Sequence, residues 1–144
     1  MKISSKTSYG FRLMLCLAIN YENDYVSLKD IATQENISEK FLEIIVATIK
    51  PLGLIDVKRG SKGGYKLAKP PHQIKITELF DALEGAIVSY DISENKSSET
   101  YNSQVVSDYW RQMQIVVKEH LDSKTLDNLL EDYKQKNENQ MFFI

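Results

Sequence analysis

Residues 38–67 read SEKFLEIIVATIKPLGLIDVKRGSKGGYKL, and this stretch decides the fold. Its first half has the start, periodicity and end of an amphipathic helix. Ser38 is a good N-cap, Glu39 places a favourable negative charge in the first turn, and Pro51 discourages helix at the residue before it. The apolar residues between them recur at helical spacing, which predicts one buried face. That face comprises Leu42, Ile45, Val46 and Ile49.

The second half of the stretch predicts a β-hairpin with a basic tip. Two short β-favouring runs, 54–59 and 65–68, flank the glycine-rich turn 60–64. Arg59 and Lys62 carry positive charge at this turn, and its glycines let the backbone approach a ligand closely.

The residues before this stretch predict two further helices. Residues 6–20 carry an apolar stripe wide enough for a mostly buried helix. Ser27 is a suitable N-cap for a short second helix, which should end at the polar break Glu35-Asn36. Two helices, a capped third helix and a basic hairpin follow the order of a winged helix-turn-helix domain. We place this domain at residues 1–85.

Residues 86–144 are expected to supply a linker, dimerisation helices and a C-terminal tail. Before them, Thr77 should cap a helix that Gly85 ends. After the polar segment 89–98, a long helix is expected over 99–121 and a last helix over 124–136. The fold class is therefore mainly α with a small β-hairpin wing.

The long helix has an apolar stripe too wide for one small core, which predicts a homodimer. The alternative is that this stripe packs only against the last helix of the same chain. We expect the dimer contact to comprise Val106, Tyr109, Trp110, Met113, Val116 and Val117.

Charge is distributed unevenly along a chain whose net charge is −2. Residues 1–75 hold twelve Lys and Arg against seven Asp and Glu, a net +5, whereas residues 76–144 hold six against thirteen, a net −7. A basic half suits double-stranded DNA. From the charge alone, chance placement of solvated side chains explains the asymmetry equally well. A winged helix that binds proteins instead of DNA is the alternative function.

In the DNA-binding interpretation, the outward face of the 38–50 helix enters the major groove. The residues on that face are Ser38, Lys40, Glu43, Ala47 and Lys50. Glu43 could accept a hydrogen bond from cytosine N4, and the helix start suits phosphates. Arg59 and Lys62 would bring the wing to a minor groove or to phosphates.

The sequence resembles the Rrf2 family of bacterial transcription regulators over essentially its whole length. The motifs that carry the resemblance are Met1–Ser4 with Tyr9-Gly10, Ser27–Ala32, Ser38 with Phe41–Glu43, Gly53–Ile55, Arg59-Gly60 with Gly63–Tyr65, Ile76, Phe80, Leu83–Gly85 and the ending Met141–Ile144. The resemblance implies that Ser38, Lys40, Phe41 and Glu43 lie at the DNA interface, with Arg59, Lys62, Gly63 and Gly64 in the wing. Ile44, where many relatives carry a polar residue, and Pro51, which shortens the helix, depart from the family pattern.

The ending also resembles the cysteine-metabolism branch of the family. Phe142, Phe143 and Ile144 place three bulky apolar residues beside a carboxylate, which either dock on the same dimer or are captured by a partner. The resemblance makes cysteine synthase the candidate partner, because such enzymes bind C-terminal isoleucine tails.

Cysteine usage predicts a regulator without an iron–sulfur cluster. Relatives that carry a cluster place three cysteines within 86–110, whereas this chain has only Cys16, on an apolar helix. Cys16 is expected to pack as a small hydrophobe and not to act as a redox sensor. His72 and His120 lack metal-ligand spacing, and no nucleophilic triad or phosphate loop is present. We therefore expect a cytoplasmic, non-enzymatic protein without cofactor, metal or membrane segment.

Overall fold

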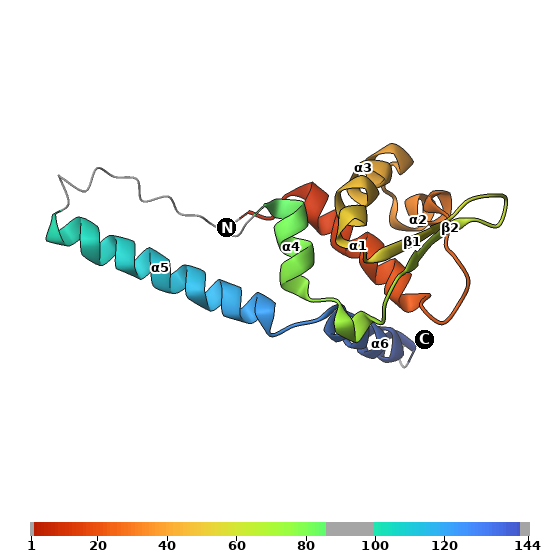
Figure 1. The fold of residues 1–144 in the computed structure, drawn as a ribbon. Helices are drawn as coiled ribbons and strands as arrows, with labels where there is room; N and C mark the ends of the chain where they lie inside the picture. Colours follow the sequence, from red (N-terminus) through yellow and green to blue (C-terminus); the bar gives the residue numbers. More distant parts are fainter. Residues whose placement is uncertain (1, 86–99, 142–144) are drawn as a thin grey trace.

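The computed structural model describes residues 2–85 and 100–141 (Figure 1). Six α-helices and one two-stranded hairpin account for most of these residues, and two short 3-10 turns join them. In chain order the elements are α1 (Ser5–Ile19), α2 (Leu28–Glu35), α3 (Glu39–Ile49), η1 (Lys50–Leu52), β1 (Ile55–Lys58), β2 (Gly64–Leu67), η2 (Pro71–Gln73), α4 (Ile76–Glu84), α5 (Tyr101–Asp122) and α6 (Leu126–Met141).

Side-chain caps fix where the first three helices begin. The hydroxyls of Ser4, Ser27 and Ser38 each accept a hydrogen bond from a backbone N–H three residues later. Each bond satisfies one of the donors that a helix start leaves without a partner. The predicted caps Ser27 and Ser38 are thereby confirmed, and Pro51 ends α3 as expected.

α1 is the centre of the core, and α2, α3, α4 and α6 all pack against it. Gly10 permits the contact with α4, because a Cβ there would lie 2.5 Å from Leu83 Cδ1. The same helix pair is joined at its ends: Glu84 accepts hydrogen bonds from the hydroxyls of Ser4 and Thr7 and from the Ser4 N–H. These bonds, that from Thr7 first, lower the pKa of Glu84 below its usual value.

The hairpin becomes a three-stranded patch through one residue of the α1–α2 loop. β1 and β2 pair antiparallel, with Ile55 opposite Leu67 and Lys58 opposite Gly64. Val26 then exchanges backbone hydrogen bonds with Tyr65 at 2.9 and 2.8 Å. Gly64 allows this close approach, because a Cβ there would lie 2.3 Å from the Val26 carbonyl oxygen. The wing is therefore anchored to the domain and is not a free loop.

The two C-terminal helices differ in how they meet this core. α6 returns to α1 and η2, and its Leu126 and Leu130 join the buried cluster. α5 extends away from the body as a long arm (Figure 1), and none of its residues is buried. None of the described helices is long and apolar enough to cross a membrane.

Several predicted boundaries change. Thr77 does not cap α4, which starts at Ile76 after Lys75 without a side-chain cap; the Thr77 hydroxyl instead donates to Asp122. α5 begins at Tyr101 because the Thr100 hydroxyl accepts from the Ser103 N–H, and α6 continues to Met141, beyond the expected residue 136. The polar segment 89–98, Glu99 and the tail Phe142–Ile144 lie outside the described residues. The division of the chain at residue 85 stays a prediction.

Candidate nucleic-acid interface

α3 presents one apolar and one polar face, as its sequence predicts. Its four inward residues are at most 5% exposed, whereas the side chains on the opposite face reach solvent. The exposed set comprises Ser38, Lys40, Glu43, Ala47 and Lys50. The Ser38 hydroxyl oxygen already accepts from the Phe41 N–H at 3.1 Å, so what it can still offer a phosphate is its proton.

The second half of α3 and the wing together form a basic cleft of about 380 Å³. Val46 lines it from α3 and Lys50 from the η1 turn directly after it, while Lys58, Arg59 and the backbone at Gly63-Gly64 line it from the hairpin. Lys50 and Gly64 are fourteen positions apart in the sequence, and the short η1 turn brings them together. Positive charge concentrated on three side chains is suited to a phosphate.

Apart from Ser38, which caps α3, the predicted interface residues fall into three groups. Lys50, Arg59, Gly63 and Gly64 share the cleft. Lys40, Glu43 and Lys62 are exposed but do not line it. Phe41 is half-buried, and its ring packs edge-on against Tyr9 with centroids 5.6 Å apart. The placement gives Phe41 a packing contact that the sequence did not predict.

Arg12 supports the turn that precedes α3 and was missed by sequence reasoning. Its guanidinium donates to the Glu35 carbonyl oxygen at the end of α2 and to Glu35 Oε2 at 3.2 Å. The same group stacks over the Tyr9 ring, 5.3 Å from its centroid. Arg12 thus links the end of α2 to the ring that packs against Phe41. An isolated arginine on an apolar helix was the only signal in the sequence.

Lys58 was the other omission. It lines the cleft, and its ammonium lies over the Tyr25 ring, 5.6 Å from the ring centroid. This is a cation–π contact, in which the aromatic face attracts the positive charge. Its position next to Arg59 in a predicted strand could have identified it, because two adjacent cations at the base of a basic turn belong to the same surface.

Cys16 is a core residue with an unreactive environment. Its side chain is 3% exposed, and the thiol donates to Glu35 Oε1 at 3.3 Å. Burial, followed by the hydrogen bond to Glu35 and the charge of that carboxylate, raises the pKa of Cys16 to about 12. The thiolate, which is the reactive form, is therefore scarce at neutral pH.

Comparison with known proteins assigns the family. The Rrf2 family model, described as an iron-dependent transcriptional regulator, matches residues 3–132. The chain belongs to the Rrf2 family, and it is a transcription regulator with a winged helix-turn-helix fold.

Two named relatives are similar over most of the chain. The HTH-type transcriptional regulator CymR of Bacillus subtilis (strain 168) is 35% identical over 144 residues, which covers 100% of both chains. The solved structure of CymR (YrzC), the global cysteine regulator of B. subtilis, matches with a TM-score of 0.80 over 91% of this chain and 97% of that one. IscR from T. potens matches with a TM-score of 0.78 and 34% identity over 94% and 90%.

The donor set of this chain does not fit the iron that the family description implies. An iron–sulfur cluster needs several thiolates, and the full sequence supplies only the buried, protonated Cys16. Residues 2–85 and 100–141 bring together no group of three or more His, Cys, Asp or Glu that could hold a metal ion. The residues of this chain therefore do not fit an iron–sulfur cluster.

Proposed function

We propose that this protein is a cytoplasmic, homodimeric repressor that binds operator DNA through α3 and the wing and operates without an iron–sulfur cluster. The observation that carries the proposal is the cleft in which Lys50 meets Lys58 and Arg59, beside the exposed polar face of α3. Membership of a family whose relatives are HTH-type regulators supports the same function.

The two parts of this surface would have different roles. Glu43 points outward from α3, where a carboxylate can read the exocyclic amine of cytosine in the major groove. Arg59 and Lys62 lie on the wing, where cations contact phosphates or a narrow minor groove. Base contacts specify a sequence, whereas phosphate contacts position the protein on any sequence.

Dimerisation would occur through α5. Its stripe is exposed along the helix, with Val106 and Met113 each 50% and Val116 65% exposed. Among residues 2–85 and 100–141, α6 leaves this stripe exposed, which supports a contact with a second copy over packing against the last helix. An apolar hollow of about 400 Å³ adjoins the stripe between α4 and the end of α5. A second copy of the chain would cover both the stripe and the hollow. The two-fold axis of the resulting dimer would match a near-palindromic operator.

The test compares three alanine variants on two DNAs: an operator selected from a random-sequence library, and a scrambled duplex. Glu43→Ala should cost about 1–3 kcal/mol on the operator alone, which lowers specificity at one base pair. Arg59→Ala and Lys62→Ala should weaken binding to both duplexes and reduce the salt slope. Lys136→Ala, an exposed cation on α6, is the matched control. Equal effects of Glu43→Ala on both duplexes would contradict the assigned roles.

The alternative function, a winged helix that binds proteins, makes a different prediction. DNA affinity would then be weak at all salt concentrations, without the steep decline that counterion release produces. The basic cleft favours DNA binding, because a protein-binding wing has no need for three cations around one hollow.

A protein co-regulator would explain how a regulator without a cluster responds to sulfur status. The similarity to a global cysteine regulator supports cysteine synthase as that partner, with the tail Phe142–Ile144 as the segment it captures. A variant that lacks Ile144 should lose enzyme binding while it keeps operator binding. Unchanged enzyme binding would contradict capture, and loss of the dimer would instead show that the tail holds the dimer together.

A further inference from the structure

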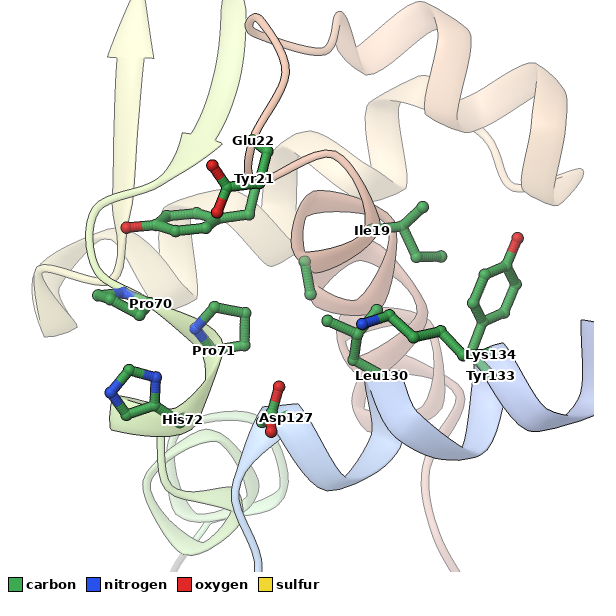
Figure 2. Close-up of a pocket in the computed structure, with 11 residues that line it drawn as sticks. Ile19, Tyr21, Glu22, Pro70, Pro71, His72, Asp127, Leu130, Tyr133 and Lys134 are labelled. Carbon is green, nitrogen blue, oxygen red and sulfur yellow. The ribbon is translucent and has the colours of Figure 1, made fainter.

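A cavity of about 560 Å³ lies between α1, η2 and α6 (Figure 2). In the fold, α6 and α3 lie on opposite sides of α1 (Figure 1). Its walls come from three places: the end of α1 with the turn after it, the η2 segment, and the first half of α6. The volume falls within the range of about 300–1,000 Å³ typical of small-molecule sites. None of the residues predicted to contact DNA lines this cavity.

The cavity combines an apolar surface with charges of both signs. Tyr21, Pro71 and Leu130 form the apolar part, and Pro71 and Leu130 are buried. Figure 2 shows Glu22 beside the Tyr21 ring and Asp127 on the opposite side of the opening. Neither carboxylate has a hydrogen bond or ion pair within residues 2–85 and 100–141.

Lys134 supplies the opposite charge. Figure 2 shows its side chain extending back over Leu130 toward the cavity. Its ion pair with Glu131 is 3.5 Å long, and both side chains are more than half exposed. Such an exposed ion pair contributes little free energy, so the Lys134 ammonium is available to a ligand. A ligand with only positive charge would be repelled by Lys134, and a ligand with only negative charge would be repelled by Glu22 and Asp127.

We propose that this cavity binds a small zwitterion with an apolar body, such as an amino acid or a short peptide. The ligand ammonium would lie between Glu22 and Asp127, the ligand carboxylate at Lys134, and the apolar body on Tyr21, Pro71 and Leu130. The walls belong to separate elements, so an occupied cavity would also hold α6 more firmly against α1. The inference goes beyond the proposed function and does not depend on DNA binding.

The experiment is a titration of the full-length, isotope-labelled protein followed by NMR. The probes are L-phenylalanine, glycyl-L-phenylalanine, and three analogues of phenylalanine that lack one or both charges: N-acetyl-L-phenylalanine, phenethylamine and N-acetyl-L-phenylalanine amide. At least one zwitterion should shift the Tyr21, His72 and Tyr133 amides saturably. Loss of either charge should weaken binding about tenfold. The first two probes distinguish a free amino acid from a peptide as the source of the same chemistry.

Two pairs of α6 variants test the placement. Asp127→Asn and Lys134→Gln should each weaken zwitterion binding about tenfold. Asp132→Asn and Lys136→Gln make the same changes on exposed positions outside the cavity and should leave it unchanged. Circular dichroism verifies that every variant is folded. Absence of saturable binding by both zwitterions, equal binding of the neutral amide, or full affinity in both cavity variants would overturn the proposal.

Discussion

α3 and α5 are both amphipathic helices, yet the structure treats their apolar faces in opposite ways. α3 buries its four inward residues to 5% exposure or less. α5 is twice as long and buries no residue, although seven of its apolar and aromatic side chains are at least half exposed. The two helices show that periodicity identifies a face that must be covered, but not the molecule that covers it.

The difference follows from what surrounds each helix. α3 packs against α1, α2 and α4, so its face is satisfied within the chain. Among the described residues, α5 contacts mainly α4, near the C-terminal end of α5, and the rest of α5 extends away from the body (Figure 1). Such an apolar stripe on a protein surface marks an interaction site. The contrast separates residues that stabilise the fold from residues that would join two copies.

The largest expected effect is on the buried side of this comparison. Ile45→Ala removes a fully buried side chain from α3 and should lower the free energy of unfolding by about 2–5 kcal/mol. Chemical denaturation measures this loss. A decrease below 1 kcal/mol, on the order expected for a surface position, would mean that the α3 face is not part of the core.

On α5, Met113→Asp should break the dimer and spare the fold. A charge in the centre of an apolar contact costs several kcal/mol, so we expect the dimer to weaken at least about a hundredfold. Sedimentation measures the loss, and red-shifted emission of Trp110, the single tryptophan, reports it independently. Gln112→Asp is the matched control, because residue 112 lies outside the predicted contact. A wild-type chain that sediments as a monomer at micromolar concentration would disprove the interface.

Thiol reactivity compares the core and the arm directly. Cys16 is 3% exposed with a pKa raised to about 12, whereas Val105 on α5 is 68% exposed. At pH 8, alkylation of Cys16 should be at least roughly a hundredfold slower than that of Val105→Cys in a Cys16→Ala background. Raising the pH to 10 should bring the exposed thiol close to its maximal rate, whereas the slower Cys16 rate should keep rising about tenfold per pH unit, because its thiolate fraction grows in proportion below a pKa of about 12. Equal rates would show that α1 opens readily.

The smallest expected change in stability is at Ile44, which directly precedes Ile45, the position with the largest. Ile44 neighbours Ile45 in α3 but is 50% exposed, so Ile44→Ala should change the free energy of unfolding by no more than about 0.5 kcal/mol. The pair therefore holds the substitution constant and varies only burial. Comparable losses from Ile44→Ala and Ile45→Ala would contradict the orientation of α3.

The sequence by itself determined the order of the elements and the exposed residues of α3 that we propose as part of the DNA interface. Serine caps, the 3.6-residue period of α3 and the glycine-rich turn act over a few residues, so they can be recognised without a fold. For the same reason the outward positions of Lys40 and Glu43 could be predicted from their spacing. The single cysteine likewise excluded a multi-cysteine cluster from composition alone.

Only the tertiary structure decided which distant residues meet. It placed Lys50 with Arg59 and added Lys58 to the same cleft, linked Arg12 to Tyr9 and Glu35, and formed the cavity between α1, η2 and α6. It also made Thr77 a partner of Asp122 instead of a cap. Backbone hydrogen bonds from Ile76 to Lys124 and from Leu126 to Ile74 hold the α5–α6 turn, which follows Asp122, at the start of α4. These contacts depend on how helices cross and where chain segments return. Local spacing carries no information about either, because each contact joins residues whose separation is set by the packing of the whole core.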